Sequence, residues 1–251
     1  MTKVIAVAQH KGGTGKTTST LNLGAALSKQ GKHVLLVDLD PQANLSQSLG
    51  ILEADKNIYG AFKKAYPISE AIVNTTEGLD LVPSTLDLTG AEIELSSVIG
   101  REYILKELLE GMNKSYDYIF IDCPPSLGLL TANAFTAARF IIIPLQAQYL
   151  ALQGLNKLME VVEIIKRGIN KDLKVGGVFI TQYDNRKVLN RNVHDTINEL
   201  FKSQVFNTVI RDNIALAEAP VNGVDIFRYA PKSKGAEDYL ALSEEVIHVC
   251  K

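Results

Sequence analysis

The sequence contains no tryptophan and only two cysteines, Cys123 and Cys250, among its 251 residues. Two thiols are too few for a disulfide framework, and one chain alone cannot complete a zinc or iron–sulfur site with them. No run of eighteen apolar residues is present, and the apolar stretch over residues 4–8 is too short for a signal peptide. We therefore expect a soluble, cytoplasmic protein.

An excess of charge of one sign is also missing. The chain has 26 basic and 28 acidic side chains and a net charge of −2, so any contact with nucleic acid must come from a local patch. Hydrophobic residues make up 46% of the sequence, which is enough to fill a sizeable core and excludes disorder as the main state.

Short apolar runs alternate with helical patterns along the chain. The runs predict strands over residues 4–8, 33–37, 79–82, 118–121, 140–143 (closed by Pro144), 174–180 and 205–210. The helical patterns cover residues 17–30, 44–48, 68–74, 102–112, 127–138, 150–166, 192–202 and 236–249. Because the first strand–helix–strand unit closes within about forty residues, we predict a parallel sheet with right-handed crossovers. The fold class is thus α/β: one domain over residues 1–251 with a doubly wound, mostly parallel sheet and helices on both faces.

A glycine-rich loop joins the first predicted strand to the first predicted helix. It reads Lys-Gly-Gly-Thr-Gly-Lys-Thr-Thr over residues 11–18. Glycines let the backbone fold around a phosphate, and the following helix presents its first N–H groups to the same anion. Lys16 is expected to reach the β- and γ-phosphates, and the Thr17 hydroxyl to ligate Mg²⁺. The strict pattern G-x-x-x-x-G-K-[ST] fails because His10 replaces its first glycine, and a plain turn with two solvated lysines is the alternative.

Carboxylates stand where two of the predicted strands end. Asp38 and Asp40 follow the strand over residues 33–37, and Asp122 follows the strand over residues 118–121. Ligands of open parallel sheets lie beyond the carboxyl ends of the strands, so these side chains should converge on the loop. Asp122 suits a residue that holds Mg²⁺ through water. Each aspartate has the alternative of capping the next helix.

The loop with its second lysine resembles the deviant Walker A motif of the ParA/MinD branch of P-loop ATPases. In that family the lysine at the position of Lys11 reaches across a dimer interface to the nucleotide of the other subunit. The segment Asp-x-Asp-Pro-Gln of the family maps onto residues 38–42, which implies that Asp40 orients or activates the attacking water and that Asp38 lies near the metal. The resemblance implies catalytic roles for Lys11, Lys16 and Asp40, nucleotide contacts from Lys11, Gly12, Gly13, Thr14, Gly15, Lys16, Thr17, Thr18 and Asn213, and metal contacts from Thr17, Asp38 and Asp122.

Further segments extend the likeness over nearly the whole chain and make it closest to the ParA/Soj type. They cover residues 81–84, 122–126, 181–186 and 217–220. The resemblance implies an ATPase with slow intrinsic turnover that uses ATP and Mg²⁺ and forms a homodimer when ATP is bound. It also implies the partitioning or positioning of a plasmid, a chromosome or a protein assembly. A ParB-like adaptor would stimulate hydrolysis, and nonspecific double-stranded DNA would be the matrix, with nucleoid association in a prokaryote.

Basic residues for such a DNA contact are expected in the C-terminal third. Residues 186–234 hold an excess of three basic over acidic side chains, which a solvated polar face would also explain. Two positions that are usually basic in Soj-like relatives are Asp212 and Ala215 here, so the DNA site uses other residues or is weak. The candidates are Arg186, Lys187, Arg191, Lys202, Arg211, Lys232 and Lys234.

Three alternatives share parts of this pattern. A MinD-like membrane-associated positioning ATPase would need a basic amphipathic end, whereas residues 242–251 are acidic. An electron-transfer protein similar to the nitrogenase iron protein would need two well-placed thiols. A metabolic P-loop enzyme, such as a small-molecule kinase or an amidoligase, would turn over ATP rapidly with its substrate and ignore DNA.

Overall fold

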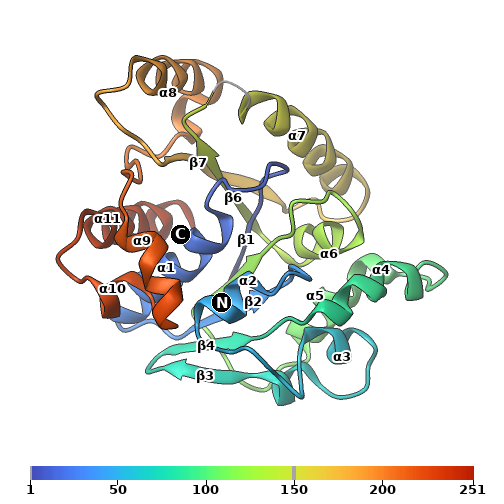
Figure 1. The fold of residues 1–251 in the computed structure, drawn as a ribbon. Helices are drawn as coiled ribbons and strands as arrows, with labels where there is room; N and C mark the ends of the chain where they lie inside the picture. Colours follow the sequence, from blue (N-terminus) through green and yellow to red (C-terminus); the bar gives the residue numbers. More distant parts are fainter. Residues whose placement is uncertain (1, 149–150) are drawn as a thin grey trace.

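A seven-stranded sheet forms the centre of the computed structural model, which describes residues 2–148 and 151–251 (Figure 1). The strand order is β3-β4-β2-β5-β1-β6-β7, and all neighbours run parallel except β3, which is antiparallel to β4. The strands are β1 (Lys3–Val7), β2 (Val34–Asp38), β3 (Val73–Thr76), β4 (Leu79–Val82), β5 (Tyr118–Asp122), β6 (Phe140–Gln146) and β7 (Lys174–Thr181). The predicted doubly wound, mostly parallel sheet is confirmed.

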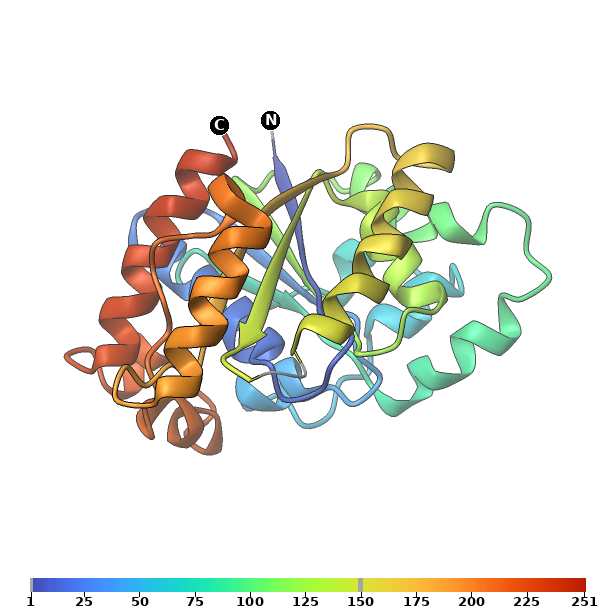
Figure 2. The ribbon, with the colours of Figure 1, turned by 90° about the horizontal axis from the view of Figure 1, so that it is seen from above.

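Helices cover both faces of this sheet, and the sequence alternation of the strands divides the core between them (Figures 1 and 2). In β2, Leu35 and Val37 face one cluster of buried side chains while Val34 and Leu36 face the other. The first cluster lies under α3 (Ile58–Phe62), α4 (Ala91–Glu94), α5 (Ile104–Glu110), α6 (Leu129–Ala137), α7 (Ala151–Gly168) and α8 (Val188–Phe201). The second lies under α1 (Lys16–Lys29), α2 (Asn44–Ser48) and α11 (Lys234–Val249), and α9 (Ala215–Glu218) and α10 (Ile226–Tyr229) pack beside it.

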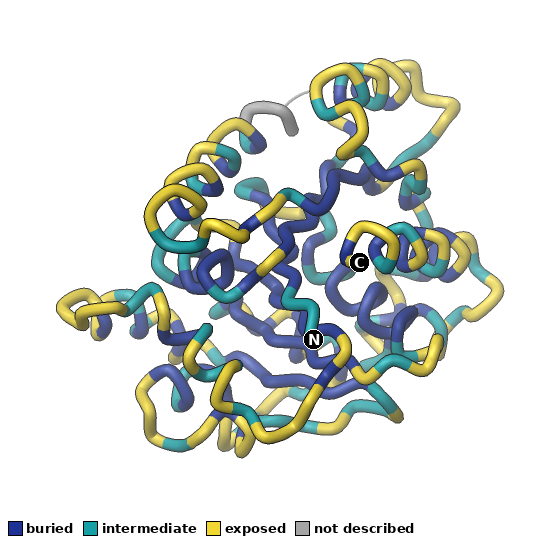
Figure 3. Tube along the Cα trace, turned by 180° about the vertical axis from the view of Figure 1, so that it is seen from behind, coloured by how far each residue is buried: buried dark blue, intermediate teal, exposed yellow. Residues whose placement is uncertain are grey.

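Helix α1 lies unusually close to the sheet. A Cβ atom added to Gly24 would stand 2.6 Å from Cδ2 of Leu36 in β2, so any larger residue there would require the Leu36 side chain to shift. Figure 3 shows that the central sheet is buried and that the helices around it are partly exposed. Short 3-10 turns complete the chain at Ile68–Ala71, Leu86–Gly90, Arg101–Tyr103, Lys202–Gln204 and Ala219–Asn222.

The structure corrects three of the predicted elements. The helix expected over residues 68–74 is a 3-10 turn followed by β3, whose edge position tolerates the polar residues Asn74 and Thr75. The strand expected over residues 205–210 is absent from the described residues, where only a single parallel bridge joins Val205 to Val178. The strand from Phe140 continues through Pro144, because β1 pairs with β6 only as far as Ile142 and no donor is needed beyond it. The predicted helix start at Leu150 lies outside the described residues.

The carboxyl ends of the three central strands reach one edge of the sheet together. Val7 and Asp38 both pair in register with Asp122, the last residue of β5. The loops after β1, β2 and β5 therefore leave the sheet side by side, and this edge carries the candidate site. Within residues 2–148 and 151–251, no helix is both long and apolar enough to cross a membrane.

Candidate active site

The loop after β1 has the backbone geometry of a phosphate cradle. Gly13 and Gly15 adopt φ values of +73° and +85°, a left-handed conformation that side chains disfavour. Helix α1 begins at Lys16 directly after this turn, so its first N–H groups and positive dipole end face the space the loop encloses. Thr181 at the end of β7 fixes the loop from outside by donating a hydrogen bond of 2.9 Å to the Thr14 carbonyl.

Lys16 is buried in this loop, with only 7% of its surface exposed. Its Nζ lies 3.4 Å from the carbonyl oxygen of Lys11, on the far side of the turn. Burial lowers the pKa of the ammonium group, while the nearby carboxyl groups of Asp122 and Asp40 oppose that shift. A largely buried cation beside a helix N-terminus is poised to bind the charged oxygens of a polyphosphate.

Thr17 and Asp122 form the part of the site that suits a divalent metal ion. The Thr17 hydroxyl donates a hydrogen bond of 2.7 Å to Oδ2 of Asp122, and Thr20 donates to Oδ1 at 3.3 Å. Burial, followed by the charge of Asp38, raises the pKa of Asp122 to about 8. The charge of Lys16 offsets this rise only in part. A hydroxyl and a buried carboxyl group are suitable oxygen ligands for Mg²⁺, whose positive charge would favour the ionised carboxylate. No three potential metal-binding side chains cluster within the described part of the chain, and Mg²⁺ commonly takes its other ligands from phosphate and water.

Asp38 and Asp40 lie on the neighbouring loop and differ in how their oxygens are used. Oδ1 of the fully buried Asp38 accepts from the Asp40 amide at 3.2 Å, and Oδ2 accepts from the amide and hydroxyl of Ser46 at 2.8 and 2.7 Å. Asp38 thus holds its own loop together. Burial raises its pKa to about 6. Asp40 accepts a hydrogen bond of 3.0 Å from the Gln42 amide through Oδ1, and its charge acts on Lys16.

Lys11 has surroundings quite different from those of Lys16. Its Nζ donates to Oε1 of Gln148 at 2.9 Å and to Oε1 of Gln146 at 3.4 Å; Gln146 ends β6 and Gln148 follows it. The loop therefore carries one lysine turned into its own cradle and one turned towards the neighbouring strand end.

Asn213 lines a hollow of about 180 Å³ that adjoins the phosphate loop. Gly15 and Thr18 of the phosphate-loop region line this hollow together with Gln182, Asp212 and Leu216. The Asn213 side chain accepts a hydrogen bond of 2.9 Å from the Ala215 amide. This position suits a base attached to a phosphate chain held by the loop.

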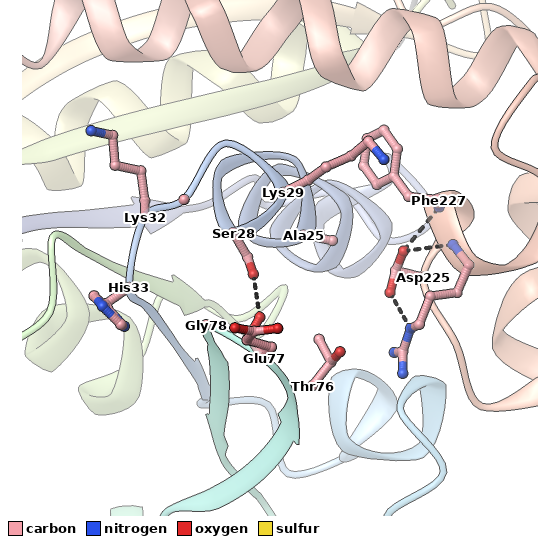
Figure 4. Close-up of a pocket in the computed structure, with 12 residues that line it drawn as sticks. Ala25, Ser28, Lys29, Lys32, His33, Thr76, Glu77, Gly78, Asp225 and Phe227 are labelled. Atoms are coloured by element: carbon pink, nitrogen blue, oxygen red, sulfur yellow. Dashed lines mark hydrogen bonds and ion pairs between the residues drawn. The ribbon is translucent and has the colours of Figure 1, made fainter.

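A larger hollow of about 520 Å³ lies at the opposite edge of the sheet, between the end of α1 and the β3–β4 turn (Figure 4). Its basic side chains do not converge: Lys32 and His33 point apart, and Lys29 extends towards Phe227. Its arginine, Arg228, forms an ion pair with the buried Asp225. This hollow therefore does not bring a group of basic side chains together, and the candidate site is the one at the phosphate-loop edge.

The structure divides the basic residues expected to contact DNA. Arg186 and Lys187 follow β7 close to Gln182, whose amide reaches the Gly13 carbonyl, so these residues and Arg191 lie near the phosphate-loop edge. Lys202 ends α8, about 20 Å away for a helix of 14 residues. Arg211 pairs with Asp238 and Glu237, whereas Lys232 and Lys234 are exposed before and at the start of α11.

Four residues with contacts at the site are missing from the set of site residues predicted from the sequence: Thr20, Ser46, Thr181 and Gln182. Thr20 lies three residues after Thr17 on the same helix face, so helical spacing alone places it near Asp122. Thr181 and Gln182 belong to the family-like segment over residues 181–186, but their contacts with the phosphate loop form only when β7 folds beside it. The contact between Ser46 and Asp38 likewise forms only when the loop between them folds.

Comparisons with known proteins agree with this geometry. A family model described as an AAA domain matches residues 2–175. The chain is 47% identical over 249 residues to the sporulation initiation inhibitor protein Soj of Bacillus subtilis, with 98% of each protein covered. It is 44% identical to the chromosome partitioning protein ParA of Myxococcus xanthus, covering 98% of this chain and 88% of that protein. Among solved structures, cobyrinic acid a,c-diamide synthase of Mycobacterium smegmatis with bound ADP and magnesium is 37% identical, with a TM-score of 0.88 over 99% of this chain and 95% of the other.

Proposed function

The chain belongs to the ParA and Soj family of partition ATPases, and from this premise we propose that it is a switch in which ATP joins two subunits and hydrolysis separates them. The protein is an ATPase that uses ATP and Mg²⁺ to position a cargo. The observation that carries the proposal is the phosphate loop, whose two lysines have separate surroundings.

Binding of the nucleotide is assigned to the loop and the start of α1. The backbone of Gly12, Gly13, Thr14 and Gly15 would surround the phosphates, with Lys16, Thr17 and Thr18 completing the cradle and Asn213 facing the base. Thr17 and Asp122 would hold Mg²⁺, which supplies positive charge to the phosphate oxygens during transfer. Asp38 supports this region through the loop that it binds, because its side chain accepts hydrogen bonds only from Asp40 and Ser46 among the described residues.

Hydrolysis is assigned to Asp40 together with Lys16. The side chain of Asp40 accepts only one hydrogen bond among the described residues, from the Gln42 amide. The side chain of Asp38 accepts three, so the oxygens of Asp40 are the more available of the two. Asp40 would accept a hydrogen bond from the attacking water and orient it. A single carboxylate without a further cation orients water weakly, which accounts for slow turnover until a partner completes the site.

Dimerisation is assigned to Lys11. Its ammonium group is bound by two neutral glutamine side chains, Gln146 and Gln148, and by no carboxylate in the part of the chain that the structure describes. A cation bound by neutral groups does not have to leave a counter-charge before it binds the phosphates of a second subunit. Two nucleotide-laden edges repel each other, so a lysine from each side lowers the free energy of bringing them together.

The proposal also includes three partners or places outside the chain. Nonspecific DNA serves as the matrix, a ParB-like adaptor stimulates hydrolysis, and the protein associates with the nucleoid. Arg186, Lys187 and Arg191 are exposed near the phosphate-loop edge, and Lys232 and Lys234 are exposed before and at the start of α11. A dimer closed at the phosphate-loop edge would present two copies of each. Doubling a modest patch favours weak, salt-sensitive binding to nonspecific DNA in the ATP-bound state. Such binding would place the protein on the nucleoid.

Measuring ATP hydrolysis and retention on plain duplex DNA tests this function. We expect slow hydrolysis that needs Mg²⁺, and retention at low salt with ATP when Asp40→Ala blocks turnover. Rapid turnover that depends on a small carboxylic acid substrate and ignores DNA would instead favour an amidoligase, the class suggested by the synthase of similar structure. That outcome would contradict the partition function.

A further inference from the structure

The hydroxyl of Ser46 connects the ends of two strands beneath the candidate active site. Ser46 lies in α2 and is 1% exposed. Its Oγ donates a hydrogen bond of 2.7 Å to Oδ2 of Asp38 at the end of β2. The same oxygen accepts a hydrogen bond of 3.0 Å from the amide of Ser84, just after β4. Both hydrogen-bonding capacities of this hydroxyl are therefore used in a buried setting.

Asp38 extends this connection to Asp40. Its Oδ2 accepts hydrogen bonds from Ser46, and its Oδ1 accepts one from the Asp40 amide. One carboxylate is therefore hydrogen-bonded to both ends of the loop over residues 40–46. The chain from Ser84 through Ser46 and Asp38 ends at the residue assigned to orient water. A buried carboxylate depends on such donors, because desolvation otherwise disfavours its charged form.

The loop that these bonds enclose does not have a locally preferred conformation. Ala43 has φ +53°, in the left-handed region that disfavours residues other than glycine. The turn is closed by a hydrogen bond of 2.9 Å from the Ala43 amide to the Asp40 carbonyl. Bonds at the ends of the loop, made by Asp38 and Ser46, must therefore stabilise the shape that presents Asp40.

We propose that Ser46 is a positioning residue for ATP hydrolysis, which fixes Asp40 through Asp38 and ties this loop to the end of β4. The proposal rests on the proposed function, in which Asp40 orients the attacking water. Ser46 acts through another residue, since its side-chain bonds go to Asp38 and Ser84. A displacement of a catalytic group by about 1 Å lowers the rate of a reaction by up to about 100-fold.

Steady-state hydrolysis by Ser46→Ala tests this proposal. Alanine removes a donor to Asp38 and the acceptor for the Ser84 amide, while the contacts of Lys16 and Thr17 are untouched. We expect kcat to fall by about tenfold or more, with the affinity for Mg-ATP changed by less than about twofold. Ser46→Thr keeps the hydroxyl and should restore at least about half of the wild-type kcat.

Ser84→Ala is the matched control. The Ser84 hydroxyl is buried next to Ser46 but has no hydrogen-bond partner among the described residues, and its amide remains in the variant. This substitution removes a buried hydroxyl of the same size without breaking the chain of bonds, so kcat should stay close to wild type. Thermal denaturation of all three variants verifies that each is folded, and Ser46→Cys replaces Ser46→Ala if the latter fails to fold.

Three results would overturn the proposal: an unchanged kcat in Ser46→Ala, equal losses in Ser46→Ala and Ser84→Ala, or a loss of kcat that Ser46→Thr does not restore. Asp40→Ala separates these failures from a failure of the proposed function. If wild type hydrolyses ATP and Asp40→Ala does not, a normal Ser46→Ala contradicts only the role of Ser46. If Asp40→Ala hydrolyses ATP normally, the role of Asp40 itself is wrong, and the positioning proposal falls with it.

Discussion

Lys16 is the residue on which nucleotide binding depends most directly. It is 7% exposed and faces the carbonyl side of its own loop. We expect Lys16→Ala to weaken Mg-ATP binding by at least about 100-fold, because no other cation lies inside the turn to compensate the phosphate charge in the described structure. Titration with a fluorescent ATP analogue measures this loss. Lys29→Ala, an exposed lysine at the other end of α1, is the control and should bind normally.

Asp122 combines a functional role with a cost to the stability of the nucleotide-free protein. Its pKa is raised from 3.8 to about 8, first by burial and then by the charge of Asp38. The native state therefore keeps a proton that the unfolded chain has lost, so stability falls as the pH rises from about 4 to about 8.

We expect Asp122→Asn to remove part of this pH dependence and to abolish hydrolysis. A gain of 1 kcal/mol at pH 8 would raise Tm by about 2–4 °C in a chain of this size. Calorimetry from pH 5 to pH 8 without nucleotide measures the effect, and the exposed Asp55→Asn is the control. A lower Tm at pH 8 than wild type would show that the ionised carboxylate stabilises the fold.

At the scale of elements, α11 holds the segment that lines the hollow beside the phosphate loop. Asp238 accepts from the Arg211 amide at 2.9 Å and from its guanidinium at 2.6–3.0 Å, and Arg211 is two residues from Asn213. Arg211, one of the residues expected to contact DNA, is thus bound to Asp238 within its own subunit, where it stabilises the segment that lines the proposed base site.

Asp238→Asn is expected to loosen this wall. We expect about tenfold weaker binding of ADP, with the affinity for inorganic tripolyphosphate unchanged, because tripolyphosphate has no base. Competition against a fluorescent nucleotide compares the two ligands. Glu237→Gln removes only the single exposed contact to Arg211 and should have little effect. Equal losses for both ligands would place the effect on the phosphate loop instead.

The elements also show how far a sequence defines such a site. The phosphate loop was predictable because its glycines and lysine act through local backbone geometry at a strand–helix junction. Asp38 and Asp122 were predictable as members of one edge because both end buried strands. The link from Ser46 to Asp38 and Ser84 depends on loops that meet only after folding, so spacing did not reveal it. Residues 205–210 are apolar like a strand, but their register against β7 is irregular. The Phe206 amide donates to the Val178 carbonyl and the Ile210 amide to the Ile180 carbonyl, so a step of four residues spans two residues of β7 and no continuous ladder forms.

At the scale of the whole molecule, the exposed basic residues predict a DNA surface on one edge. Each phosphate contact that is lost should reduce the slope of log affinity against log salt by about 0.9. We expect Arg191→Ala in the ATP-bound, Asp40→Ala background to reduce this slope by about 2, since a dimer carries two copies. Lys202→Ala, at the far end of the same helix, is the control. Equal effects of the two variants would mean that the DNA surface is not at the phosphate-loop edge.

The central claim is that ATP joins two subunits through Lys11. The most direct measurement is light scattering after size-exclusion chromatography at micromolar concentration, with Mg²⁺ and a non-hydrolysable ATP analogue. We predict a dimer for wild type and a monomer for Lys11→Ala, which should still bind nucleotide within about threefold of wild type because Lys16 and Thr17 are retained. A wild type that stays monomeric, or a Lys11→Ala variant that dimerises as well as wild type, would contradict the account.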